Sequence, residues 1–159
     1  MKHKKVYSWT ISFLALFAGG SITVLFILVP IWQSLAPEEV LAWFANFGAR
    51  VGITMVPMQV IPLILSLYAY YISIGITRLR WLVTNISNGI ILVMLPIYFL
   101  PVNFSFVNGT MSLDEVSSEL VTWEIIHIIR TFLTIISVIF AVMALLRHEN
   151  EKYIKAKSG

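Results

Sequence analysis

The chain contains no cysteine, and charged residues are scarce. Without cysteine there is no disulfide framework, no thiolate metal site and no cysteine nucleophile. Asp, Glu, Lys and Arg together make up 12% of the residues, whereas hydrophobic residues make up 58%. That balance is far from the composition of a soluble globular domain. The low charge therefore excludes a soluble enzyme and directs attention to the membrane.

Four long runs are almost free of charge. They cover residues 6–37, 51–77, 81–113 and 125–146, and only the last is interrupted, by Arg130. About 20 apolar residues suffice to cross the hydrocarbon core of a bilayer as a helix. We therefore predict an all-α integral membrane protein, a four-helix bundle in a single domain over residues 1–159. The expected spans are about 7–32, 51–74, 81–100 and 121–146, followed by a polar cytoplasmic tail over 148–159.

The basic residues indicate the orientation of these spans. Nine of the eleven Lys and Arg residues fall before the first run, between the second and third, or after the fourth: Lys2, Lys4, Lys5, Arg78, Arg80, Arg147, Lys152, Lys155 and Lys157. Positive charge favours the cytoplasmic side, so both termini are expected there. The first run is longer than the apolar core of a signal peptide and is interpreted as a retained span. A bacterial inner membrane is the expected location.

This distribution of charge also excludes nucleic acid as a partner, because the net charge of +3 comes from residues that flank the spans. The segments on the opposite side are expected to be less regular. Pro37 followed by two acids predicts a short helix on the membrane surface. Residues 102–113 are expected to form a loop with a turn at Asn108-Gly109, and Ser112 to Glu115 predicts the start of the last helix. The five tryptophans, Trp9, Trp32, Trp43, Trp81 and Trp123, are interpreted first as interface anchors.

The strongest functional signal lies at the start of the fourth run. Trp123, His127, Arg130 and Thr134 are spaced to share one face of a helix. An ionisable side chain inside a membrane span is costly and is by default a candidate functional residue. Arg130 precedes Arg147 by 17 residues, roughly 25 Å along a helix, which places it just below the outer interface. We expect this face to point into the protein.

Two polar residues of other spans are expected at a similar depth. Gln59 lies below the outer end of the second span, and Asn103 follows the third. We predict that they converge with Arg130 on one polar pocket near the outer surface. Glu124 is a further candidate, because it could orient His127 or pair with Arg130. Three of these residues also have an alternative role that involves no pocket. Arg130 could extend to the headgroups, Glu124 could be a solvated acid, and Asn103 could cap a turn.

Histidine offers no metal chemistry. His3 and His148 are expected on the inner side, so neither faces His127. A bis-histidine haem and a histidine-rich zinc site are therefore not expected, and neither is any other metal or cofactor. A neutral His127 that donates one hydrogen bond is as plausible as a general base.

The chain also resembles a widespread four-helix membrane family of unknown function that includes the anthrone oxygenases. The residues that carry this resemblance are Pro101-Val102-Asn103 and the sequence Trp-x-x-x-His-x-x-Arg-Thr from Trp123 to Thr131. Some members oxidise an anthrone to an anthraquinone with dioxygen, without a metal or flavin. The resemblance implies that His127 takes a proton from the substrate, while Arg130 and Asn103 hold the resulting oxyanion.

The sequence is thus compatible with two functions. The first is a small-molecule enzyme or binder in which Asn103, His127 and Arg130 are catalytic, and Gln59, Trp123 and Glu124 bind the ligand. The second is a non-catalytic scaffold or partner subunit that uses the small residues Gly19-Gly20-Ser21 for contact. The expected partners are the lipid bilayer, a hydrophobic or aromatic small molecule and a second copy of the chain. A transporter is less favoured, because a single four-helix unit would need to dimerise to enclose a path.

Overall fold

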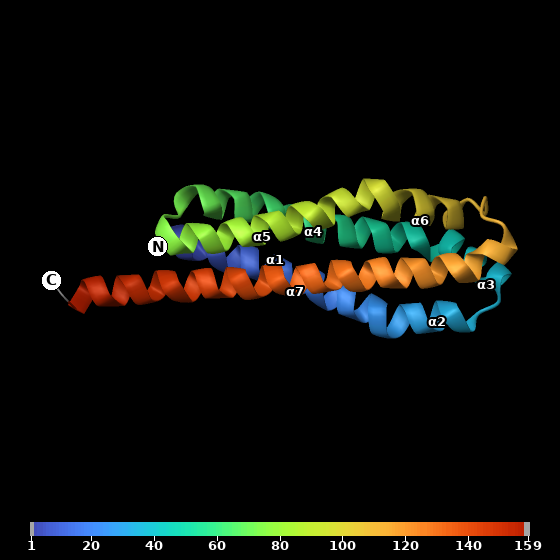
Figure 1. The fold of residues 1–159 in the computed structure, drawn as a ribbon, viewed down its shortest axis with the longest axis horizontal. Helices are drawn as coiled ribbons and strands as arrows, with labels where there is room; N and C mark the ends of the chain where they lie inside the picture. The colour runs from blue at the N-terminus through green and yellow to red at the C-terminus, as the bar shows by residue number, and fades with distance from the viewer. Residues whose placement is uncertain (1, 158–159) are drawn as a thin grey trace.

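The protein consists of four helical rods in the computed structural model, which describes residues 2–157 (Figure 1). Three of the rods are interrupted by a π-helical turn, denoted η. The first rod comprises α1 (Lys2–Thr23), η1 (Val24–Leu28) and α2 (Val29–Ser34). The second comprises α3 (Pro37–Trp43), η2 (Phe44–Gly48) and α4 (Ala49–Ile72). The third comprises α5 (Gly75–Met94), η3 (Leu95–Phe99) and α6 (Leu100–Val107), and the fourth is α7 alone (Leu113–Lys157). The predicted all-helical fold of four rods is confirmed.

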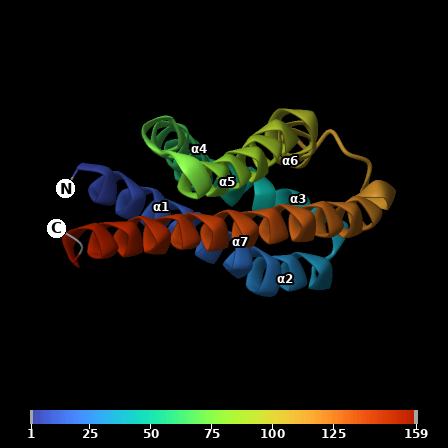
Figure 2. The ribbon, with the colours of Figure 1, turned by 60° about the vertical axis from the view of Figure 1, so that its left-hand side comes forward.

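The rods form a closed ring in which each packs against its two neighbours. Helix α1 packs against α4 and α7, and α5 packs against the same two helices. In Figure 2, α7 runs the length of the bundle, α5 and α6 lie above it, and the first rod crosses behind it, so that α1 appears above α7 and α2 below it. The two termini lie at the same end, and α7 extends beyond the other rods there (Figure 1). The predicted polar tail, over residues 148–159, continues α7 as a helix up to Lys157. Residues 158–159 lie outside the part of the chain that the structure describes.

All four rods are long and apolar enough to cross a membrane. The candidate spans are His3–Ser34, Pro37–Ile72, Gly75–Val107 and Leu113–Asn150. Large hydrophobic side chains remain exposed along their outer faces, among them Phe26, Ile53, Tyr71 and Ile97. A soluble protein rarely exposes apolar surface on this scale, so the bundle suits a lipid environment.

Two of the π-helical turns have a clear cause in the sequence. The backbone N–H of Val29 donates to Val24 O, and that of Leu100 donates to Leu95 O. Each of these residues directly precedes a proline, Pro30 or Pro101. A proline ring clashes with the carbonyl four residues earlier in an α-helix, and a wider turn relieves that clash. No proline accounts for the turn at Phe44–Gly48.

The segments at the end remote from the termini differ from the prediction. A helix begins at Pro37 as predicted, but it is not a separate short helix, because α3 continues through η2 into α4 and extends the second rod. The expected loop is also shorter, since α6 remains helical as far as Val107. The predicted turn is confirmed at Asn108-Gly109, where Gly109 has φ +61°, and so is the start of α7 at Leu113. The helical extension places Asn103 on a helix face rather than in a turn.

Three of the five tryptophans are buried, which is a correction to their interpretation as interface anchors. Trp32 and Trp123 belong to an apolar cluster near the end remote from the termini, and Trp81 belongs to a second cluster near the termini. Trp9, in contrast, is 60% exposed on α1. Buried rings of this size contribute to packing between helices and cannot anchor the protein at a lipid–water interface.

Hydrogen bonds join the rods in the half that contains the termini. Ser66 Oγ donates to Asn85 Oδ1 at 2.6 Å, and Asn85 Nδ2 donates to Ser66 O at 3.2 Å. Thr84 Oγ1 donates to Ser137 O across α5 and α7 at 3.3 Å. Tyr7 OH and Ser73 Oγ are also hydrogen-bonded. Interhelical bonds of this kind link helices where lipid supplies no hydrophobic driving force.

Candidate ligand-binding site

The predicted polar face of α7 points into the bundle. Trp123, His127, Arg130 and Thr134 are all buried, and Arg130 is only 7% exposed. Their spacing of 3.6 residues per turn places them in one row along the inner side of the helix. The expectation that this face points into the protein is confirmed.

The guanidinium of Arg130 is buried between aromatic rings. Its Cζ lies 4.2 Å from the ring centroid of Phe99 and 5.7 Å from that of Phe17. Among the side chains that the structure describes, no carboxylate forms an ion pair with it, and its buried Nε has no hydrogen-bond partner. A cation–π contact stabilises a desolvated guanidinium by about 2 kcal/mol or somewhat more. A buried charge without an anion is a costly feature that calls for an explanation.

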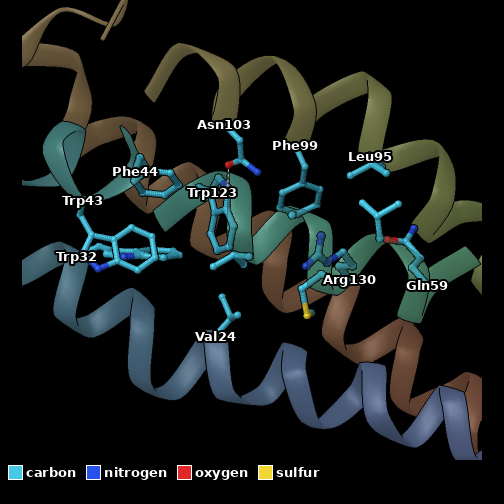
Figure 3. Close-up of a pocket in the computed structure, with 15 residues that line it drawn as sticks. Val24, Trp32, Trp43, Phe44, Gln59, Leu95, Phe99, Asn103, Trp123 and Arg130 are labelled. Carbon is cyan, nitrogen blue, oxygen red and sulfur yellow. Dashed lines mark hydrogen bonds between the residues drawn. The ribbon is translucent and has the colours of Figure 1, made fainter. Parts of the chain in front are cut away.

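Arg130 lines a cavity of about 70 Å³ in the half of the bundle remote from the termini. Figure 3 shows its aromatic end, with Trp32, Trp43 and Phe44, and its polar end, with Arg130 and Gln59. Residues of η1, η2 and η3 all contribute to the wall, which contains no Asp or Glu. A cavity of this size holds one or two waters or a small polar group. Arg130 is the one charged residue in this lining, so the lining carries a single positive charge.

Two further predicted residues line this cavity beside Arg130. Asn103 Oδ1 accepts a hydrogen bond from Trp123 Nε1 at 3.0 Å, which fixes the amide at the wall (Figure 3). Gln59 is buried, and its Nε2 has no hydrogen-bond partner among the described residues. Trp123 itself is also part of the lining. The four residues come from three rods, and the structure brings them together as predicted.

His127 lies behind this wall. Its Nε2 donates to Ser21 O at 2.9 Å, and its ring stacks on Trp123 with the centroids 4.8 Å apart. The side chain is fully buried and does not line the cavity. Because a carbonyl only accepts hydrogen bonds, Nε2 carries a proton, whereas the buried Nδ1 has no hydrogen-bond partner among the described residues. In this arrangement His127 joins α7 to α1 and holds the Trp123 ring in place.

Glu124 lies apart from the cavity. Its Oε2 accepts a hydrogen bond from Gln33 Nε2 at 2.7 Å, which links α7 to α2. In the described part of the chain it forms neither an ion pair with Arg130 nor a hydrogen bond with His127. Glu124 instead borders a separate surface depression near Ser117 and Leu120. Glu124 therefore neither orients His127 nor pairs with Arg130, and its contacts fit the alternative of an acid at the surface.

Much of the wall was not foreseen from the sequence. The unpredicted lining residues are apolar side chains or glycines: Val24, Trp32, Trp43, Phe44, Gly48, Val51, Gly52, Met55, Val56, Leu95 and Phe99. Single apolar residues carry no signal that distinguishes a cavity wall from a packed core. The Val29-Pro30 and Leu100-Pro101 pairs were the available signal, since π-helical turns occur frequently at functional sites.

Comparisons of the chain with family models, curated proteins and solved structures found no match in any of the three. Any function is therefore argued from the site alone.

Proposed function

We propose that the chain is an integral membrane protein with both termini on the cytoplasmic side. The four apolar rods and the asymmetric distribution of Lys and Arg support this orientation. Because the chain lacks cysteine, single-cysteine variants give an unambiguous test. In intact bacterial cells, a membrane-impermeant maleimide should label Thr110→Cys directly and Lys5→Cys only after permeabilisation. The reverse pattern would place the cavity near the cytoplasm and refute the orientation.

We propose further that this protein binds a small molecule through an anionic group at Arg130. The observation that carries this proposal is a buried guanidinium that faces a cavity and has no anion among the described residues. A carboxylate or phosphate group would supply the missing charge and accept hydrogen bonds from the guanidinium. The amide donors of Gln59 and Asn103 are placed to complete such a site. The arrangement serves binding without requiring any residue to react.

Thermal stabilisation by matched acids and alcohols tests the proposal. Purified protein is titrated with acetate and ethanol, with benzoate and benzyl alcohol, and with inorganic phosphate. A ligand at 100 times its Kd stabilises the folded state by about 2.7 kcal/mol, or about 5–10 °C for a chain of this size. We expect an acid, but not its alcohol, to raise the Tm of the wild type, and Arg130→Gln to abolish that rise.

Arg78→Gln is the matched control, because Arg78 is exposed and its guanidinium lies over the Tyr70 ring. This variant removes one positive charge and one cation–π contact at the end of the bundle that contains the termini. It should respond to the acids as the wild type does. If no acid stabilises the wild type, or if both variants respond equally, Arg130 is not an anion site.

A reaction similar to that of the anthrone oxygenases is the second candidate. One observation favours it: Asn103 and Arg130, the two residues expected to hold an oxyanion, line the same cavity. His127, the expected base, is separated from the cavity by Trp123, and about 70 Å³ is too little for three fused rings. Oxygen uptake with anthrone as substrate, lost in Arg130→Gln and in His127→Ala, would establish this activity. Uptake equal to that of a protein-free control would exclude it.

The scaffold alternative is less favoured by the packing. It requires Arg130 to reach the headgroups or to pair with Glu124, but Arg130 is buried and Glu124 accepts a hydrogen bond from Gln33 instead. The small residues Gly20 and Ser21 are also used inside the chain. A Cβ at Gly20 would lie 2.9 Å from Met55 Sδ, and Ser21 is fully buried. Gly20 and Ser21 of the face expected to contact a partner are therefore packed inside the bundle, against α4 and α7, and only Gly19 remains open.

A further inference from the structure

A second hollow opens on the outer surface of the bundle, next to the Arg130 cavity. It is a groove of about 510 Å³ between α4 and α6, lined almost entirely by apolar groups such as Ile53, Pro57 and Phe104. Small-molecule sites typically have volumes of about 300–1,000 Å³. The groove therefore has the size of a ligand body, whereas the cavity has the size of a polar group.

The groove and the cavity have a common wall. Gly48, Gly52, Val56 and Asn103 line both of them. Two of these residues have no side chain, and a Cβ added at Gly52 would meet nothing within 4 Å. Only Val56 and Asn103 therefore place side chains in the partition. Behind it lies Arg130, which is buried and has no ion-pair partner among the described side chains.

We infer that the ligand is a membrane-dissolved amphiphile with an acidic head group, which enters sideways from the lipid between α4 and α6. The head group lies at Arg130, and a single apolar chain lies in the groove. This inference rests on the proposed anion site and names its ligand class. Charge complementarity selects the acid, since the only formal charge in the cavity lining is positive. The apolar lining and the lipid-facing position of the groove favour a ligand with an apolar hydrocarbon chain.

The experiment uses the full chain in nanodiscs of phosphatidylcholine, which carries no net charge. The probe is a long-chain fatty acid with a photoreactive group in mid-chain, and labelled peptides are identified by mass spectrometry. We expect labels on the α4 segment around Ile53 and on α6 near Phe104. An unlabelled fatty acid should compete, whereas the alcohol of equal chain length and acetate should not. A lysophosphatidate competes equally well if the site accepts phosphate as readily as carboxylate.

Gly52→Leu tests the groove without breaking the fold. Leucine replaces a helical glycine in open space, so the substitution should not lower the Tm. It should reduce labelling at least about tenfold, because the side chain fills the groove. Gly89→Leu is the matched control, since Gly89 is also helical, a Cβ there also meets nothing within 4 Å, and it lies on α5 away from the groove. The control should label as the wild type does.

The possible outcomes separate the two proposals. If Arg130→Gln abolishes labelling but Gly52→Leu and Gly89→Leu do not, the anion site stands and entry through the groove is refuted. If Gly52→Leu alone abolishes labelling, a chain binds in the groove without help from Arg130, and the inference that joins the two hollows fails. If none of the three variants changes the labelling, or if the alcohol competes as well as the acid, the probe binds elsewhere and the inference is overturned.

Discussion

Replacing Arg130 by methionine should make the unliganded protein more stable. The effective penalty for burying a charge is several kcal/mol, and no carboxylate among the described side chains compensates for it. The contact with Phe99 at 4.2 Å offsets about 2 kcal/mol of this penalty, and the longer contact with Phe17 offsets less. Methionine fills a similar space with a flexible apolar chain. We expect a net gain of about 2 kcal/mol, or about 4–8 °C in Tm.

Thermal unfolding in detergent, followed by circular dichroism, measures this gain. Arg78→Met is the control, because it also removes a cation–π contact but starts from an exposed guanidinium 4.5 Å from the Tyr70 centroid. Its stability should change by no more than about 0.5 kcal/mol. Arg130→Lys retains the buried charge and should show no gain. A lower Tm for Arg130→Met than for Arg78→Met would mean that the guanidinium is compensated, and the argument for an anion site would lose its basis.

Two further predictions concern packing around the cavity, and both are checked by thermal unfolding. Gly48→Ala should destabilise the protein by about 1–3 kcal/mol, because the new Cβ would lie 3.0 Å from Val107 Cγ2. Gly52→Ala should be neutral or stabilising by up to about 1 kcal/mol, and equal effects at the two glycines would refute the close approach of α6 to η2. Tyr98→Phe should cost about 1.5–3 kcal/mol, because Tyr98 OH donates to the Glu119 carboxylate at 2.6 Å between η3 and α7. A Tyr98→Phe variant as stable as the wild type would show that water replaces this bond.

The fold was predictable from the sequence because its signals are long. Uncharged runs of more than 20 residues predict helices independently of tertiary contacts, and the spacing from Trp123 to Thr134 fixed the buried face of α7. Arg130 was singled out by its cost in a membrane span. In these cases a single physical constraint determines the outcome.

The remaining features depend on contacts between rods. Polar residues after Pro37 suggested a surface helix, yet α3 continues the second rod because it packs against α6 and α7. Tryptophan near a helix end suggested an interface, yet Trp32 packs against Trp123 with the ring centroids 5.4 Å apart. Hydrophobicity alone does not distinguish a side chain that faces lipid from one that faces another helix. Most of the cavity wall was missed for the same reason, since it is apolar, whereas the polar residues Gln59, Asn103 and Arg130 were predicted to converge.

The irregular features of the bundle, its π-helical turns and its buried charge, lie together in the half remote from the termini. Near the termini, small residues and hydrogen bonds such as Ser66–Asn85 hold uninterrupted α-helices together. Three π-helical turns, and a charge with no counter-ion among the described side chains, surround the cavity in the other half. Natural sequences break local rules chiefly at functional sites and compensate elsewhere. A scaffold that only fills space would have no reason to keep Arg130 in such surroundings, whereas a site that recovers part of its cost when an acid binds would.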